Sequence, residues 1–334
     1  MTSVDAVIVG AGMSGLSAAH RLGEAGLDVV VLERDRWVGG RLGTRQVGKA
    51  RVDHGAQFFT ARNRIFGDWV DTLLAQDLVY EWCRGFGAND GFPRFVARGG
   101  MGELARILAH DLTVRLDSGV RSMGAAPAGD RWRVELEAPD GAEAETIDAT
   151  AVVLTAPVPQ SLELLAAGGV TLGHDEAEGL PLIDYEPTLA LVTVLDRAPS
   201  LPRPGAVQRD VGAFSFVADN QVKGLSDVPA LTLHASAAMS NTLWTESDAK
   251  AIATLLSAAE EFVAGRKVVE TNLTRWQYAT PQSVWTNRCC TITDEPGPLV
   301  LAGDAFGGPR VEGAWLSGDA AAANVLKRLG VEPA

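Results

Sequence analysis

The sequence of 334 residues predicts an α/β fold, and a chain of this length corresponds to about two domains. Near the N-terminus, a β-branched run leads through a glycine-rich turn into a helical pattern. Near the C-terminus, an apolar run ends in Gly-Asp ahead of an alanine-rich stretch. The middle of the chain mixes helical and β-rich patterns, which indicates a second domain of mixed α+β type.

Composition excludes several classes of protein. Hydrophobic residues make up 46% and charged residues 21%, so neither disorder nor a fibrous repeat is expected. The formal net charge of −13 disfavours binding to nucleic acid or to an anionic membrane surface. No run approaches the ~18 apolar residues of a membrane span, and Asp5 stands where a signal peptide would be basic. Three cysteines are too few and too unevenly spaced for a disulfide framework or a zinc site. We therefore expect a cytoplasmic protein, with its oligomeric state left open.

The first forty residues contain the strongest motif. Residues 5–9 (DAVIV) are predicted as a buried strand, Leu16–Ala25 as a helix and Val29–Leu32 as a second strand. A G-x-G-x-x-G run lies between the first strand and the helix; its residues are Gly10, Ala11, Gly12, Met13, Ser14 and Gly15. In this context the glycines let a pyrophosphate approach the backbone at the helix N-terminus. The motif therefore predicts a dinucleotide-binding domain.

Glu33 directly follows the second strand, where a dinucleotide-binding domain carries its ribose-binding acid. Its carboxylate would accept hydrogen bonds from the adenosine ribose hydroxyls. The same charge would repel a 2′-phosphate, which argues against a phosphorylated ribose.

The segments that follow resemble the FAD-dependent amine oxidase superfamily. Residues 36–44 (RWVGGRLGT) are similar to its G-G-R-x-x-T motif, and residues 53–59 (DHGAQFF) to the segment beneath the isoalloxazine ring. Leu299–Asp304 resembles the strand whose terminal acid holds the ribitol. Gly313–Gly318 resembles the opening of a helix, expected over Asp319–Leu329, whose positive end points at the flavin.

Within this superfamily, the short chain and residues 275–279 (RWQYA) are most similar to the renalase-like, bacterial-type branch. The resemblance implies a Rossmann-like FAD-binding domain interleaved with a mixed α+β substrate domain. The FAD-binding domain is expected over residues 1–62, 111–157 and 291–334, and the substrate domain over 63–110 and 158–290. The cofactor is expected to be non-covalent FAD, because no cysteine lies at the position used for covalent attachment.

The residues that we expect to bind FAD come from the motifs above, from Arg34 and from Val120, whose backbone would touch the adenine. They are Gly10, Gly12, Met13, Ser14, Gly15, Glu33, Arg34, Gly39, Gly40, Arg41, Gln57, Phe58, Val120, Gly303, Asp304, Gly313, Ala314, Trp315 and Leu316.

Hydrophobic spacing predicts further elements between these motifs. Two helices are predicted, over Arg64–Val79 and directly after Gly102. A third is predicted to begin at a capping box, Thr245–Asp248, and to run through Val263. Strands are predicted at Thr113–Met123, Trp132–Leu136, Ala151–Leu154, Ala190–Leu195, Ala213–Val217 and Ala230–His234.

A flavin oxidase holds its substrate in an apolar cavity over the ring. The candidate pocket residues are Phe59, Tyr185, His234, Trp276, Tyr278, Arg310 and Trp315, although any single aromatic is more typical of a core than of a pocket. Arg310 stands where monoamine oxidases carry a cage tyrosine. None of the five lysines has the sequence context of those enzymes' water-binding lysine. Both departures weaken the case for an amine substrate.

The resemblance implies an FAD-dependent oxidase of a small molecule, in which a hydride passes to flavin N5 and O₂ is reduced to H₂O₂. The preferred hypothesis is renalase-like oxidation of the 2- or 6-dihydronicotinamide isomers of NAD(P)H to NAD(P)⁺. The product ring is aromatic, so this reaction needs no general base. Two alternatives stay open: a flavin amine oxidase or related small-molecule FAD dehydrogenase, and a non-catalytic flavin-binding protein. The physiological electron acceptor is also left open.

Overall fold

The computed structural model describes residues 2–87, 90–139 and 142–332, which form two compact units. The first unit comprises Met1–Gly40, Leu104–Asp184 and Pro281–Ala334, and the second comprises Arg41–Glu103 and Tyr185–Thr280. Residues 1, 88, 89, 140, 141, 333 and 334 of the predicted domains lie outside the described part of the chain.

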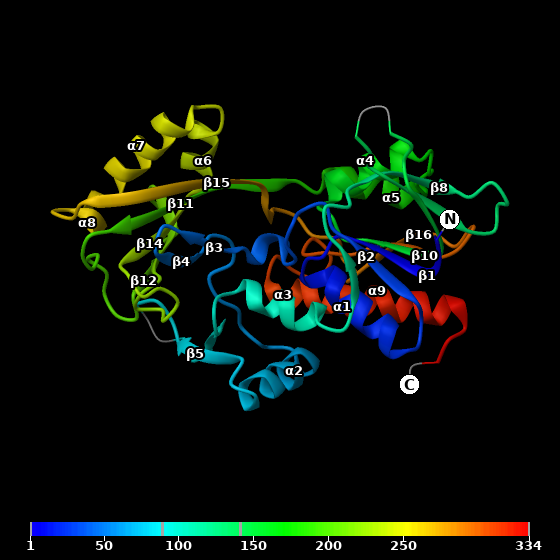
Figure 1. The fold of residues 1–334 in the computed structure, drawn as a ribbon, viewed down its shortest axis with the longest axis horizontal. Coiled ribbons are helices and arrows are strands. Elements are labelled where there is room, and N and C mark those ends of the chain that lie inside the picture. Colours follow the sequence, from blue (N-terminus) through cyan, green and yellow to red (C-terminus); the bar gives the residue numbers. More distant parts are fainter. Residues whose placement is uncertain (1, 88–89, 140–141, 333–334) are drawn as a thin grey trace. The chain divides into compact units, whose positions relative to one another are not determined.

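A largely parallel sheet forms the centre of the first unit (Figure 1). Its strands are β1 (Thr2–Val9), β2 (Val29–Leu32), β7 (Thr113–Arg115), β8 (Val120–Ala125), β9 (Trp132–Leu136), β10 (Thr146–Leu154), β16 (Cys290–Thr293) and β17 (Leu299–Leu301). The main path runs β16-β17-β10-β1-β2-β7, and β9 and β8 extend from β10. Pairing is parallel from β17 through β7, whereas β9 and β16 pair antiparallel. The predicted α/β fold is therefore confirmed.

The helices of this unit lie between the strands of the sheet in the sequence or follow the last of them. They are α1 (Met13–Glu24), α3 (Gly102–Ala109, which crosses the unit boundary), α4 (Val158–Ala167), α5 (His174–Gly179) and α9 (Val311–Leu329), with 3₁₀ turns η1 (Gly40–Leu42, at the boundary) and η2 (Leu180–Leu182). α1 and α9 pack closely, because a Cβ on Gly318 would lie 2.0 Å from the Ser14 carbonyl oxygen. α9 also begins eight positions before the predicted start at Asp319, since Val311–Gly318 continues the same helix.

The second unit contains a sheet with strand order β12-β13-β14-β11-β15 and two separate ribbons, β3-β4 and β5-β6. The sheet strands are β11 (Tyr185–Leu195), β12 (Ala206–Gln208), β13 (Phe214–Asp219), β14 (Ala230–Ala235) and β15 (Val268–Pro281). The ribbon strands are β3 (Thr44–Val47), β4 (Ala50–Asp53), β5 (Val79–Cys83) and β6 (Arg94–Ala97). The helices are α2 (Arg64–Ala75), α6 (Ala237–Leu243), α7 (Asp248–Ala258) and α8 (Glu260–Val263).

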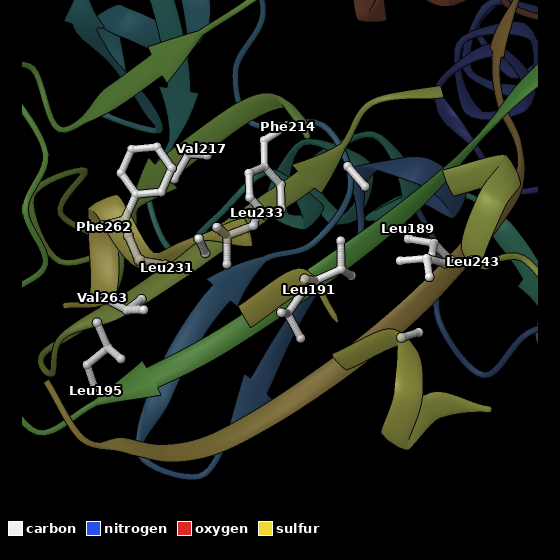
Figure 2. Packing of buried hydrophobic residues seen from close by; sticks show 14 residues of the cluster. Leu189, Leu191, Leu195, Phe214, Val217, Leu231, Leu233, Leu243, Phe262 and Val263 are labelled. Atoms are coloured by element: carbon white, nitrogen blue, oxygen red, sulfur yellow. The ribbon is translucent and has the colours of Figure 1, made fainter. Parts of the chain in front are cut away.

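Alternating side chains of β11 give this sheet two buried faces. Leu189, Leu191 and Leu195 pack with α6, α7 and α8 in one apolar cluster (Figure 2). Val192 and Val194 point to the opposite face, where they pack against Val47, Ala50 and Val52 of the β3-β4 ribbon. The ribbon is thereby fixed against the sheet, and β4 ends at Asp53 inside the unit.

Several predicted boundaries are wrong, among them the single strand expected over Thr113–Met123, which is divided between β7 and β8. The helix expected to reach Val79 ends at Ala75, because Asp77 adopts a positive φ of 55° that no right-handed helix allows. The N-cap of α7 is Ser247 rather than Thr245, and its side chain accepts the Lys250 N–H. The same predicted helix is interrupted at Ala259, which separates α7 from α8.

No helix within residues 2–87, 90–139 and 142–332 is both long and apolar enough to cross a bilayer.

Candidate functional site

The loop between β1 and α1 has the backbone geometry that its glycines predict. Gly10 has a φ of +104°, and a Cβ on Gly15 would lie 1.9 Å from the Gly10 carbonyl oxygen. A side chain at either position would therefore strain or displace the loop. Gly12 is different, because a Cβ there would meet no atom within 4 Å. The loop is thus tightly packed around the Cα of Gly15 and open beside the Cα of Gly12.

This loop fits the pyrophosphate of a dinucleotide. The Ser14 hydroxyl is buried at the start of α1 and has no hydrogen-bond partner among the described residues. The α1 N-terminus adds a partial positive charge beside the open space at Gly12. Gly39 lies against the same loop, because its N–H donates to the Ala11 carbonyl at 2.8 Å. A phosphate oxygen would supply the acceptor that the Ser14 hydroxyl lacks.

Glu33 organises this loop as well as offering acceptors to a ligand. Its Oε2 accepts the Ala11 N–H at 2.8 Å and its Oε1 accepts the Asp35 N–H at 3.0 Å. Burial raises the pKa of Glu33, and these two backbone hydrogen bonds oppose the rise. The Ser118 N–H donates to the Glu33 carbonyl at 2.8 Å, which places the segment leading to Val120 alongside. The structure therefore brings the predicted ribose acid and the predicted adenine contact together.

Glu33→Ala should weaken FAD binding by about ten- to hundredfold, since a hydrogen bond to a charged acceptor contributes ~1.5–3 kcal/mol. Titration of the apoprotein, followed by quenching of flavin fluorescence, measures the change. Asp35→Ala is the matched control, because that exposed residue contributes its backbone N–H rather than its side chain. Equal affinity in the Glu33 and Asp35 variants would show that the ribose is held elsewhere.

The C-terminal motif lies beside α1 and α9. The Gly303 N–H donates to the Ser317 hydroxyl at 2.9 Å, and this hydroxyl donates to the Arg288 carbonyl. Asp304 follows in the same turn and is 8% exposed. The carbonyl of Trp315 accepts a hydrogen bond from Ser17 at 2.9 Å. The turn predicted to hold the ribitol is thus fixed to the same pair of helices as the glycine loop.

The start of α9 lies close to the chain that precedes it. A Cβ on Gly313 would lie 2.3 Å from the Gly308 carbonyl oxygen. Ala314 donates its N–H to the Arg310 carbonyl. The exposed guanidinium of Arg310 forms no hydrogen bond or ion pair with the residues that the structure describes. Leu316 is buried, and Arg34 is exposed next to Glu33.

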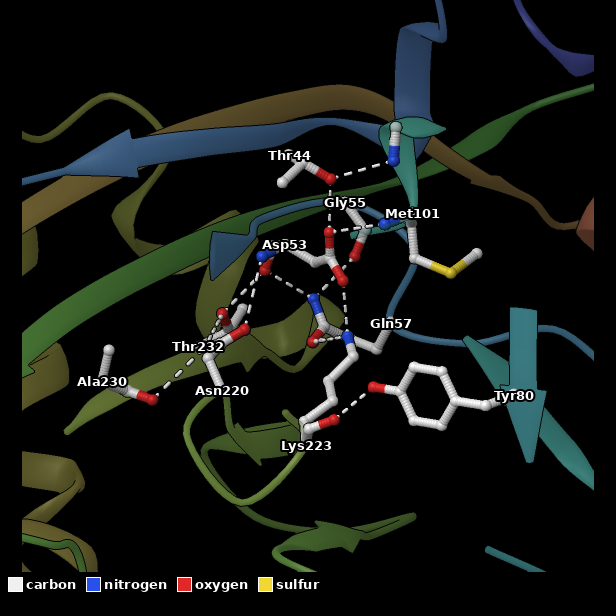
Figure 3. A network of polar contacts seen from close by, with 11 residues as sticks. Thr44, Asp53, Gly55, Gln57, Tyr80, Met101, Asn220, Lys223, Ala230 and Thr232 are labelled. Atoms are coloured by element: carbon white, nitrogen blue, oxygen red, sulfur yellow. Dashed lines mark hydrogen bonds and ion pairs between the residues drawn. The ribbon is translucent and has the colours of Figure 1, made fainter. Parts of the chain in front are cut away.

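A buried ion pair between Asp53 and Lys223 forms the polar centre of the second unit (Figure 3). Lys223 Nζ lies 2.6 Å from Asp53 Oδ2, and both side chains are 0% exposed. Asp53 Oδ1 accepts the Thr44 hydroxyl and, at 2.8 Å, the Met101 N–H. Burial lowers the pKa of Lys223, and the Asp53 carboxylate opposes this effect.

The same network joins segments that are far apart in the sequence. The Asp53 carbonyl accepts hydrogen bonds from Gln57 Nε2 and from the Thr232 hydroxyl, both at 2.7 Å. Asn220 donates to the Thr232 hydroxyl at 3.0 Å. The Lys223 carbonyl accepts a hydrogen bond from the Tyr80 hydroxyl. Segments from both parts of the unit's sequence therefore meet at this pair of charges.

Sequence reasoning missed Lys223. The other four lysines are exposed, and this one alone is enclosed. The signal available was weak: a lysine inside a short polar run, residues 219–223 (DNQVK), between two apolar strands. Because Asp53 lies 170 positions earlier, no local pattern could have paired them.

Two neutral histidines lie close to this network. His54 stacks on Trp276 with ring centroids 5.2 Å apart, and Trp276 Nε1 donates to the His54 carbonyl at 2.9 Å. Burial, with Arg45 nearby, lowers the pKa of His54 to about 3. Burial also lowers the pKa of His234 to about 4, with a smaller contribution from Lys223. Neither imidazole carries a charge at neutral pH.

The remaining aromatic candidates fall into separate groups. Tyr185 and Tyr278 form an edge-to-face pair with centroids 5.5 Å apart. Phe59 packs in a different cluster with Phe66 and Phe95, as a core residue does. Three of the residues predicted to bind FAD have contacts of their own. Phe58 packs with Phe86 and Phe216, and Gly40 approaches Gly12. Arg41 donates to the Tyr278 and Ala279 carbonyls. The described residues contain no cluster of three side chains that could hold a metal ion.

Comparison with known proteins identifies both parts of the chain. Residues 8–73 match the model of the NAD(P)-binding Rossmann-like domain, and residues 65–326 match that of the flavin containing amine oxidoreductase family. A segment of 93 residues is 41% identical to the possible lysine-specific histone demethylase 1 of Drosophila melanogaster, covering 26% of this chain and 10% of that protein. A segment of 131 residues is 32% identical to achacin of Lissachatina fulica, covering 38% of this chain and 24% of that protein. The chain therefore matches only short parts of these relatives.

Similarity of fold extends over nearly the whole chain. A putrescine oxidase structure superposes with a TM-score of 0.72 at 16% identity, covering 98% of this chain and 99% of that one. A putative protoporphyrinogen oxidase from Exiguobacterium sp. 255-15 gives a TM-score of 0.72 at 16% identity, covering 97% of this chain and 98% of that one. The family match spans most of the sequence and includes Lys223 and the C-terminal motif, whereas Asp53 lies in the part matched by the Rossmann-like domain. The chain thus belongs to the flavin containing amine oxidoreductase family.

Proposed function

We propose that this enzyme oxidises the 2- or 6-dihydronicotinamide isomers of NAD(P)H to NAD(P)⁺ with O₂. The observation that carries the proposal is the state of the buried carboxylates in the second unit. Among its described residues, Asp53 is neutralised by Lys223, and Asp219 accepts the Gln221 and Val222 N–H groups of a turn. Neither carboxylate is available to hold a substrate ammonium group, which an amine oxidase must bind and deprotonate.

The two histidines support the same reading. With pKa values of about 3 and about 4, His54 and His234 are poor proton acceptors at neutral pH. Removal of a hydride from a dihydronicotinamide gives an aromatic ring directly, so the reaction needs no strong base. Neutral imidazoles and stacked aromatic rings offer such a ring an environment from which water is excluded.

FAD, when bound, accepts the hydride and returns both electrons to O₂, which leaves as H₂O₂. Gly12, Ser14 and Glu33 would hold its pyrophosphate and ribose, and Asp304 its ribitol. Backbone groups of the Gln57–Phe58 segment would contact the flavin ring. The cofactor would be bound non-covalently. The unpaired guanidinium of Arg310 would offer a cation to the anionic nucleotide substrate.

Anaerobic stopped-flow reduction tests the proposal. Micromolar 2- or 6-dihydronicotinamide dinucleotide should bleach the flavin within seconds. Ordinary 4-dihydro NADH should react far more slowly, because its hydride-bearing carbon would lie away from the flavin in the same pose. Arg310→Ala should raise the substrate concentration for half-maximal reduction. Arg209→Ala should not, because that guanidinium is already paired with Glu261 at 2.6 Å.

Amine oxidation is the rival function, and the family match favours it. Benzylamine, putrescine and an L-amino acid therefore belong in the same panel. Fast bleaching by one of these amines, with no response to the dihydronicotinamide isomers, would replace the present proposal with that function.

A further inference from the structure

Two neighbouring backbone donors in the second unit have no acceptor. Within the described ranges, the N–H groups of Gln57 and Phe58 form no hydrogen bond, although those on either side do. The Ala56 N–H donates to the Arg41 carbonyl at 2.9 Å, and the Phe59 N–H donates to the Phe95 carbonyl at 3.0 Å. Gln57 is only 5% exposed. Because buried backbone donors are nearly always paired, the Gln57 N–H is placed for a ligand, and the Phe58 N–H, on a half-buried residue, lies next to it in the chain.

The side chain of Gln57 faces the other way, into the ion-pair network. Its Nε2 donates to the Asp53 and Gly55 carbonyls at 2.7 and 3.0 Å. Its Oε1 accepts a hydrogen bond from Lys223 Nζ at 3.3 Å. Every polar atom of the amide is therefore used within the protein. These three hydrogen bonds hold the Gln57 side chain in place and thereby orient its backbone N–H.

Lys223 holds both Asp53 and Gln57. Its ammonium reaches Asp53 Oδ2 and Gln57 Oε1 together, and it also lies 5.5 Å from the centre of the Trp82 ring. A buried ion pair is an inefficient source of stability, since well-packed apolar residues are often as stable in its place. An apolar pair would give Gln57 Oε1 no donor. Stability alone therefore does not account for a lysine at this position.

We propose that Lys223 is a positioning residue for the cofactor: through Gln57, it fixes the Gln57 and Phe58 N–H groups as donors to the polar edge of the isoalloxazine ring. Reduction makes that ring more electron-rich, so fixed donors stabilise the reduced form more than the oxidised form. Lys223 thereby raises the reduction potential of the bound flavin. The inference rests on the contact of the Gln57–Phe58 segment with FAD proposed above, and it does not depend on which substrate is oxidised.

The test compares stability with the flavin midpoint potential in the purified holoenzyme. Lys223→Met alone leaves Asp53 uncompensated and unfolds more readily. The double variant Lys223→Met/Asp53→Asn removes both charges, and it should recover most of the thermal stability. Its midpoint potential, measured by dye equilibration, should nevertheless stay more negative than that of the wild type. Its FAD dissociation constant should rise by about tenfold, the loss expected for one or two hydrogen bonds.

Gln57→Met is a further variant that changes no charge. It should reproduce the negative shift in midpoint potential seen in the double variant. The matched control is Arg51→Met/Glu103→Gln, which removes an ion pair of 2.7 Å anchored on the same strand β4. This control should leave the potential unchanged. If the double variant or Gln57→Met kept the wild-type midpoint potential, Lys223 would serve only to compensate the charge of Asp53. That result would overturn the proposal. Because no substrate is used, these outcomes are independent of the reaction proposed above.

Discussion

Lys223→Met should lower the free energy of unfolding by about 3–5 kcal/mol, the usual effect of breaking a fully buried ion pair. The loss arises because the Asp53 carboxylate, 0% exposed, would keep its negative charge without a cation or water beside it. Urea denaturation of the FAD-saturated protein at neutral pH measures the difference.

Lys250→Met is the matched control for this prediction. Lys250 pairs with Glu246 at 2.7 Å, but its side chain is 62% exposed, so its ion pair is worth at most ~1 kcal/mol. If the two variants lost equal stability, water would have to reach Asp53, contrary to the enclosed geometry of the network.

Gly15→Ala should lower the stability of the apoprotein, whereas Gly12→Ala should lower its affinity for FAD, although both replace a glycine of the same loop. The new methyl at position 15 would lie 1.9 Å from the Gly10 carbonyl oxygen and 2.9 Å from the Thr155 hydroxyl. The loop must then move, at a loss of ~1–3 kcal/mol in stability even without cofactor. At position 12, with a φ of −80°, the methyl meets no protein atom. The apoprotein should therefore keep its stability, while FAD affinity falls because the methyl occupies the space left for the pyrophosphate.

Thermal unfolding of the apoproteins and FAD titration together separate these two effects. Gly23→Ala is the control, because Gly23 lies inside α1 on its exposed side with open space around it. That change should stabilise the helix by about 0.5–1 kcal/mol and leave FAD binding unchanged. Full FAD affinity in Gly12→Ala would place the pyrophosphate away from this loop.

Local patterns predicted the cofactor unit well. Strand β9 over Trp132–Leu136 has the predicted bounds, and the glycine run, Glu33 and the Gly303–Asp304 turn lie close to one another. Each of these features is encoded within a few neighbouring residues, so spacing alone reveals it. The family match confirms the predicted amine oxidase superfamily.

The second unit was harder to predict, because its structure depends on contacts between distant segments. β15, with fourteen residues from Val268 to Pro281, has mostly half-buried positions and lacks a strong alternating pattern. The Asp53–Lys223 pair joins a β-ribbon to the connection between β13 and β14. Ser247 rather than Thr245 caps α7, a choice between neighbouring hydroxyls that only packing decides. For the Asp53–Lys223 pair, the deciding partner lies outside the local sequence.

The order of strands in the first unit affects how the protein is made. β17, encoded near the C-terminus, pairs with β10, and α9 packs on α1 at Gly318 and Ser14. During synthesis, the glycine loop leaves the ribosome roughly 300 residues before the segment that fixes it from the other side, and domains acquire stable structure as whole units. A nascent chain therefore carries an incomplete cofactor unit until α9 has emerged. We expect FAD to be captured only after that point in synthesis.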